Sequence, residues 1–106
     1  MGIRQSSPPR EVSGLEEHLV PGQLVVSVSG RDRGKYYLVL DKTVNNMYLV
    51  ADGEYRKVAG PKKKNIKHLS PLPQIDAEFS EKIKSGRKIT DLDVRKALKG
   101  MLNVEG

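Results

Sequence analysis

The stretch of sequence that decides the fold is Gln23–Leu40, which reads QLVVSVSGRDRGKYYLVL. It opens with a strict alternation over Gln23–Ser29, a pattern typical of a strand whose two faces differ. The segment Gly30–Gly34 is polar, and its two glycines tolerate positive φ, so it is expected to form a tight loop. Tyr36–Leu40 then combines aromatic, branched and leucine side chains, which predicts a buried strand. The stretch therefore predicts two strands joined by a basic loop.

Three later segments also have strand character. Met47–Ala51 is apolar, and Glu54–Val58 is expected to pair with it across a hairpin turn at Asp52-Gly53, because type I′ turns favour such a pair. A last short strand is expected over Asn65–Leu69. Five strands joined by turns, without a long helix between them, favour a mainly β fold. We expect residues 15–70 to form a small five-stranded antiparallel barrel, which would also hide its edge strands.

The two ends of the chain differ from this middle part. Residues 1–14 are polar and contain two prolines, so they are expected to form a flexible arm, followed by one helical turn over Leu15–Leu19. Residues 71–106 begin as a proline-containing spacer and continue as two short helices, the second starting at Thr90 with Asp93 as its capping-box partner. The apolar stripes of these helices are Ile75, Phe79 and Ile83 in the first and Val94, Ala97, Leu98 and Met101 in the second. Both helices are short, so each needs to pack on the barrel, on the other helix or on a partner.

Composition argues against several classes of function. Cysteine is absent, which excludes disulfides, a thiol nucleophile and a cysteine-based zinc site. His18 and His68 lie far apart without a third ligand, so no metal site is expected. Gly30–Lys35 lacks the spacing and the Ser/Thr of a phosphate-binding P-loop, and no catalytic set or cofactor motif is found. No apolar run approaches the roughly 20 residues of a membrane span, and the N-terminus lacks a secretory leader. We expect a soluble, cytoplasmic, non-enzymatic protein without a cofactor, a small-molecule substrate or a membrane partner.

The distribution of charge indicates a polyanionic partner. The chain carries 19 Lys and Arg against 13 Asp and Glu, for a formal charge of +6. Residues 21–75 carry a net +6, whereas residues 1–20 carry −1 and residues 76–106 carry +1. Basic side chains concentrated on a folded scaffold are typical of nucleic-acid binders. A solvated face that serves only solubility would spread its charge more evenly.

Two basic segments are the candidate contacts. The loop offers guanidinium groups that match phosphate oxygens, beside glycines that allow close approach of the main chain, although an ordinary hairpin loop with solvated charges is the alternative. In the second segment Arg56 and Lys57 face opposite ways, whereas the run Lys62–Lys64 is expected to point outward together; a nuclear-import sequence is the alternative for this run. The candidate RNA-binding residues are Gly30, Arg31, Arg33, Gly34, Lys35, Tyr37, Arg56, Lys62, Lys63, Lys64, Lys67 and His68.

Tyrosines are the available stacking residues, because Trp is absent and the sole Phe is Phe79. Strand alternation groups Tyr36 with Leu38 and Leu40, which predicts that Tyr36 points inward. Tyr37 is then expected to point outward beside the loop, where it could stack on an unpaired base. For any single tyrosine, a place in the barrel core or at its rim is the alternative.

Residues 21–40, with their strand, glycine-bearing basic loop and second strand, resemble a KOW motif. Together with Tyr48–Lys57 and Pro61–Leu69, the sequence is similar to the large-subunit ribosomal protein fourteen family of archaea and eukaryotes. The resemblance implies an SH3-like five-stranded barrel that binds ribosomal RNA through its loop and basic strand ends, with large-subunit proteins as neighbours. Tyr36-Tyr37 stand where the fuller pattern has another glycine, and the tail from Ser70 onward does not match the family's long basic extension.

The sequence therefore predicts a non-enzymatic RNA-binding protein with a KOW or SH3-like barrel. The alternative is a protein-interaction module, in which the barrel binds a peptide and the amphipathic C-terminal helices dock a partner.

Overall fold

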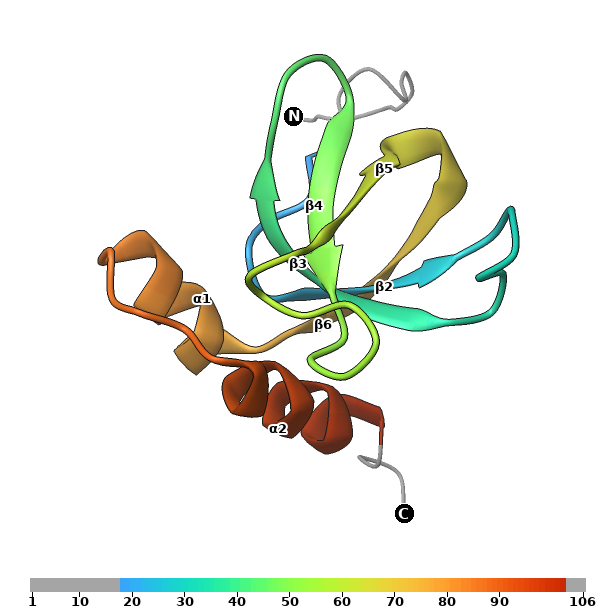
Figure 1. Ribbon diagram of the computed structural model, residues 1–106. Helices are drawn as coiled ribbons and strands as arrows, with labels where there is room; N and C mark the ends of the chain where they lie inside the picture. Colours follow the sequence, from blue (N-terminus) through green and yellow to red (C-terminus); the bar gives the residue numbers. More distant parts are fainter. Residues whose placement is uncertain (1–17, 103–106) are drawn as a thin grey trace, which may run out of the picture.

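The computed structural model describes residues 18–102. Its centre is a five-stranded antiparallel sheet in the order β5-β4-β3-β2-β6 (Figure 1). The strands are β2 (Gln23–Ser27), β3 (Tyr36–Lys42), β4 (Met47–Ala51), β5 (Lys62–Asn65) and β6 (Leu69–Ile75). Four of them follow one another as a meander, and β6 returns to lie beside β2.

The predicted barrel is corrected to an open sheet. The short 3-10 helix η2 (Ile66–His68) carries the chain from β5 to β6, which lie at opposite edges of the hydrogen-bonded order. The ladder of the described strands therefore does not close. The expected arm over residues 1–14 lies outside the described residues, as do residues 15–17 of the expected helical turn, and His18 and Leu19 are not helical.

Two predicted strands are wrong. Glu54–Val58 forms turns instead of pairing with β4, because the Asp52 carboxylate accepts hydrogen bonds from the backbone N–H groups of Glu54 and Arg56 and closes the chain locally. The partner of β4 is β5, formed by the lysine run. Asn65–Leu69 is mainly η2, and the proline-containing segment expected to be a spacer belongs to the edge strand β6.

Both faces of the sheet are buried. The helices α1 (Ala77–Lys84) and α2 (Asp91–Leu102) lie together against one face (Figure 1). The cluster on that face consists of Leu24, Leu38, Leu40, Ala51, Phe79, Val94, Ala97 and Leu98. The opposite face holds a second cluster, formed by Leu19, Val25, Tyr37, Val39, Tyr48, Val50 and Leu69. The helices thus share a core with the sheet.

Each helix begins at a capping residue, and α1 starts after Ile75, which the expected apolar stripe had included. Asp76 accepts a hydrogen bond from the Phe79 N–H at the start of α1. The predicted capping box at the start of α2 is confirmed, because Thr90 and Asp93 exchange side-chain-to-backbone hydrogen bonds of 3.0 and 3.2 Å. Lys82 of α1 contacts Asp93 at 3.2 Å and links the two helices. Neither of the α-helices within residues 18–102 has the length and apolar character needed to cross a bilayer.

Candidate nucleic-acid interface

The loop between β2 and β3 (residues 28–35) is folded around an acid, Asp32. One Asp32 oxygen accepts hydrogen bonds from Ser27 Oγ at 2.9 Å and Lys64 Nζ at 3.0 Å, and the other accepts from the Tyr37 hydroxyl at 2.9 Å. Gly30 and Gly34 adopt φ values of 83° and 89°, which residues other than glycine rarely adopt. Backbone hydrogen bonds close the loop further. The loop is therefore a fixed structure in which the only acid points inward.

The Asp32 network is charged at neutral pH. Burial raises the pKa of the Asp32 carboxyl, but the hydrogen bonds from Lys64, Ser27 and Tyr37 outweigh this effect and lower the pKa from its usual 3.8 to about 2. Burial and the hydrogen bond to Asp32 both raise the pKa of the Tyr37 hydroxyl above its usual range, so it stays a proton donor. The Asp32 carboxylate, the Lys64 ammonium and the Tyr37 hydroxyl together form a buried ion pair with a hydroxyl partner.

Two predicted orientations are wrong. Tyr37 is 2% exposed and Tyr36 is 42% exposed, the reverse of the expectation. The reason is that Tyr37 belongs to the second apolar cluster together with Val39, while Tyr36, the first residue of β3, belongs to neither cluster. A buried tyrosine cannot stack on a base without local unfolding.

The lysine run does not point outward as a unit. Because β5 is a strand, its side chains alternate between two faces: Lys62 and Lys64 lie opposite Val50 and Tyr48 of β4, and Lys63 lies opposite Leu49. Lys64 is 8% exposed and bound to Asp32, Lys62 Nζ lies 3.9 Å from Asp32, and Lys63 is exposed. Two of the three lysines thus pair with Asp32, and Lys64 is buried in doing so.

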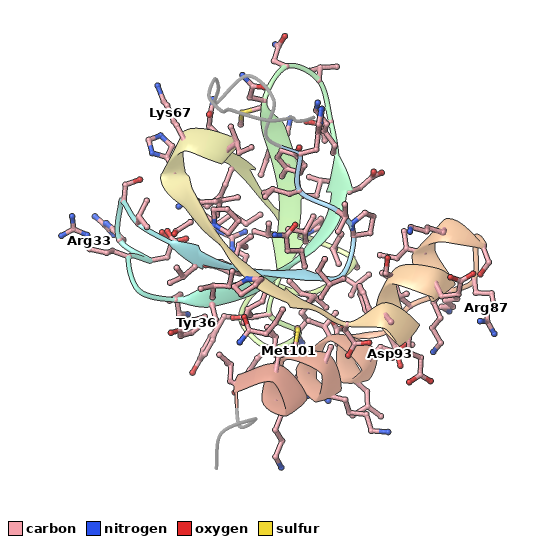
Figure 2. All side chains as sticks on the ribbon, turned by 180° about the vertical axis from the view of Figure 1, so that it is seen from behind. Arg33, Tyr36, Lys67, Arg87, Asp93 and Met101 are labelled. Carbon is pink, nitrogen blue, oxygen red and sulfur yellow. The ribbon has the colours of Figure 1, made fainter. Side chains whose placement is uncertain are left out.

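The remaining cations gather on neighbouring loops. Arg31 and Arg33 are exposed on the β2–β3 loop. That loop is joined to η2 by a hydrogen bond of 2.9 Å from Val28 N–H to His68 O, and by a contact of 2.7 Å between Ser29 Oγ and His68 Nδ1. Lys67, next in the chain to His68, is exposed, and Figure 2 shows Arg33 and Lys67 projecting on the same side, opposite to Arg87.

A second loop extends this surface. Lys35 Nζ lies 4.4 Å from the ring centroid of Tyr55, which belongs to the β4–β5 loop (residues 52–61). Arg56 follows Tyr55 and is exposed, as is the acid Glu54 on the other side of the tyrosine. We call five of the exposed cations on these loops and η2 the basic rim: Arg31, Arg33, Lys35, Arg56 and Lys67.

Tyr55 is the residue of this surface that the candidate set omits. The sequence placed Tyr55 in a β-strand, because Asp52-Gly53 is typical of a hairpin turn and the residues after it were expected to pair with Met47–Ala51. Its location between two charged residues, Glu54 and Arg56, is the sequence feature that could have indicated an exposed side chain.

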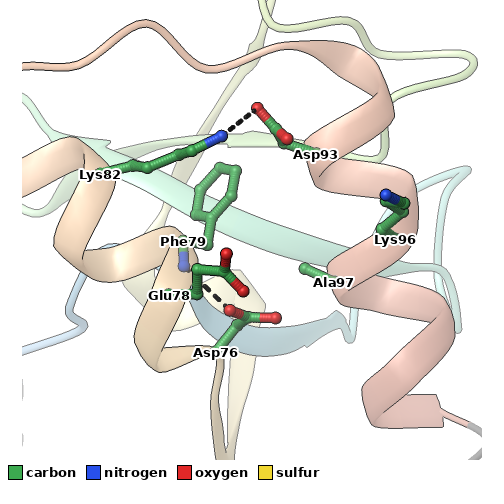
Figure 3. Close-up of a pocket in the computed structure, with 7 residues that line it drawn as sticks. All are labelled: Asp76, Glu78, Phe79, Lys82, Asp93, Lys96 and Ala97. Atoms are coloured by element: carbon green, nitrogen blue, oxygen red, sulfur yellow. Dashed lines mark hydrogen bonds and ion pairs between the residues drawn. The ribbon is translucent and has the colours of Figure 1, made fainter.

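A cavity lies elsewhere in the molecule. It has a volume of about 330 Å³ between α1 and α2 (Figure 3) and is lined by Asp76, Glu78, Phe79, Lys82, Asp93, Lys96 and Ala97. Asp76 caps α1, while Asp93 caps α2 and pairs with Lys82, so these acids already serve the fold. Within residues 18–102, no three His, Asp or Glu side chains come together as ligands for a metal ion.

A scan against models of known protein families finds none that matches the chain.

Proposed function

We propose that this protein binds RNA through the basic rim and carries out no catalysis. The observation that carries the proposal is that five exposed cations lie on adjoining loops and η2, while Asp32, the acid of the β2–β3 loop, is turned inward and neutralised by Lys64, which leaves Glu54 as the exposed acid beside them. A polyanion approaching this surface meets Arg and Lys side chains without competition from that carboxylate. Phosphate contacts of this kind supply affinity and position the protein, whatever the sequence of the nucleic acid.

The KOW resemblance makes RNA, and ribosomal RNA in particular, the proposed class of nucleic acid. Gly30 and Gly34 support this proposal, because their positive φ values let the main chain turn tightly where the motif places its glycine-bearing loop. The order of the strands supports an SH3-like arrangement in its open form, since β2 and β6, which are far apart in sequence, are neighbours. Tyr37 and Lys64 are left out of the proposed contact surface because both are buried.

The alternative of a docking module based on the helices receives less support. Phe79, Val94 and Leu98, which dominate the two apolar stripes, are buried against the sheet. Ile75 belongs to β6 and not to the first helix. The stripes are therefore mostly occupied within the molecule.

Charge reversal tests the proposed function. The variant Arg31→Glu/Arg33→Glu should weaken binding to a structured ribosomal RNA fragment by about tenfold or more at low salt, as measured by fluorescence anisotropy. The matched control is Lys84→Glu/Lys99→Glu, which makes the same charge change at exposed positions of α1 and α2. For the natural protein, log affinity should fall against log salt with a slope near −3 if about four phosphates are neutralised.

Two outcomes would contradict the proposal: a slope close to zero, or equal losses in both double variants. Co-sedimentation with large ribosomal subunits, with release at high salt, tests whether the RNA is ribosomal.

A further inference from the structure

Tyr55 combines high exposure with a well-defined position. It is 75% exposed, whereas Tyr37, Tyr48 and Phe79 are at most 3% exposed. A large aromatic side chain left in water forgoes the stabilisation that its burial would give. An exposed tyrosine on a mobile loop needs no explanation, but this loop is tied down on both sides of the ring.

The first set of ties is local. Asp52 Oδ1 accepts hydrogen bonds from the N–H groups of Glu54 and Arg56 at 2.9 and 2.8 Å. The Arg56 carbonyl accepts hydrogen bonds from the N–H groups of Asp52 and Gly53 at 2.9 and 3.0 Å. The backbone that carries Tyr55 is thus closed on itself.

The second set of ties comes from α2. Asp91 Oδ1 accepts a hydrogen bond of 2.7 Å from the Val58 N–H, and Arg95 donates one of 2.7 Å to the Gly53 carbonyl. The helix passes directly beneath the loop (Figure 1). A binding group that is already held in place loses less conformational entropy when its ligand arrives.

The charges around the ring favour a nucleotide. Lys35 Nζ lies 4.4 Å from the ring centroid, within the range of a cation–π interaction, and Arg56 follows Tyr55 in the chain, so two cations against one exposed acid, Glu54, flank the ring. A base stacked on the ring would bring its phosphate close to these two cations. Stacking on aromatic side chains beside a positively charged groove is the usual way in which proteins hold unpaired bases.

We propose that Tyr55 is a stacking platform for an unpaired base, so that the RNA bound by the basic rim contains a loop, a bulge or a single strand at this point. This inference rests on the proposed RNA-binding function and names its substrate class. A continuous A-form duplex keeps its base faces stacked on one another and has none to offer the ring.

The test compares two RNAs of equal length: a hairpin whose loop carries the fluorescent base 2-aminopurine, and a blunt duplex. Tyr55→Ala should weaken binding to the hairpin by about tenfold or more and leave duplex binding within about twofold. Tyr55→Phe should stay close to the natural protein, because the ring and not the hydroxyl does the stacking. Tyr36→Ala, at a tyrosine exposed on β3, is the matched control and should leave the preference for the hairpin intact.

A readout independent of affinity is the fluorescence of 2-aminopurine, which stacking quenches. Quenching should occur with the natural protein and with Tyr55→Phe but not with Tyr55→Ala. If both RNAs bind in a salt-dependent way and Tyr55→Ala has no effect, the stacking role of Tyr55 is wrong, but the proposed function stands. A contact with a protein partner would then be the alternative role for this tyrosine. Failure of the natural protein to bind either RNA would instead overturn the proposed function.

Discussion

Asp32 organises the loop that carries the candidate interface. It stands between two arginines in the sequence, yet its carboxylate is directed inward to Ser27, Tyr37 and Lys64. Both members of the Asp32–Lys64 pair are largely buried. Each charge is therefore stabilised by the opposite charge of its partner in place of water. Removal of either partner leaves an uncompensated charge inside the protein.

Asp32→Asn should therefore lower the free energy of unfolding at pH 7 by about 3 kcal/mol. In the natural protein the lowered pKa of Asp32, about 2 against its usual 3.8, supplies about 2 kcal/mol of stability. This stability is fully present above pH 3.8 and is lost as the pH falls toward 2. Urea unfolding at pH 7, 4 and 2.5 checks both statements.

The variant itself should lack this acid-dependent loss. Asp41→Asn, at an exposed position, is the control and should change stability by less than about 0.5 kcal/mol. Equal pH dependence in the natural protein and in Asp32→Asn would contradict the assignment.

Residue orientations were only partly predictable from the sequence. Alternation separates inward from outward positions when one face of a strand is solvated, but β3 is buried on both faces, so the pattern gave no means of placing Tyr36 and Tyr37. Lys64 was assigned to the surface because the run Lys62–Lys64 was expected to lie in a connection opened by Gly60-Pro61, whereas it forms the strand β5. The burial of Lys64 depends on Asp32, a residue 32 positions away in sequence.

At the scale of elements, α2 and the β4–β5 loop act together. Gly53 lies at their contact with φ of 78°, and a Cβ placed there would be 2.6 Å from the Asp91 carbonyl oxygen and 2.8 Å from Arg95 Cγ. The helix can lie this close to the loop because the residue at position 53 has no side chain.

Gly53→Ala should destabilise the protein by at least about 2 kcal/mol, because it combines a strained backbone with a steric clash. Gly60→Ala, in the same loop, is the matched control: a Cβ there meets no atom within 4 Å. Its effect should lie within about 0.5 kcal/mol of zero. Thermal unfolding followed by circular dichroism measures both, and equal effects would show that helix and loop are not in close contact.

Elements governed by local rules were predicted well. Met47–Ala51 and the capping box at Thr90 and Asp93 were confirmed, since apolar content and end-capping are local properties. The strand expected at Glu54–Val58 failed because the Asp52 carboxylate closes this segment locally, and because Asp91, distant in sequence, accepts the hydrogen bond of the Val58 N–H. The strand β6 was missed because two prolines argued against it, although an edge strand tolerates them.

At the scale of the whole molecule, the helices complete the core of the sheet. Leu24, Leu38 and Leu40 are at most 7% exposed, and the residues that cover this face include Phe79, Val94 and Leu98 of the helices. Burial of a leucine is worth roughly 1.5–3 kcal/mol, and a domain of this size has about 5–15 kcal/mol of net stability.

A chain that ends at Ile75 should therefore fail to unfold cooperatively, because it exposes the leucine face of the sheet. Urea titration of the shortened and full-length chains, followed by circular dichroism, makes the comparison. If the shortened chain unfolds as steeply as the full chain and at the same urea concentration, the sheet is stable by itself.

The two borders of the open sheet have a further consequence. One border is β6, where Pro71 and Pro73 have no amide hydrogen to offer, and the other is β5, with its successive lysines. The absent backbone N–H donors at the prolines and the repulsion between lysines both disfavour the pairing of a strand from a neighbouring molecule with these edges. Many copies at a high local concentration would therefore remain individual particles, and fibre growth by sheet extension is not expected.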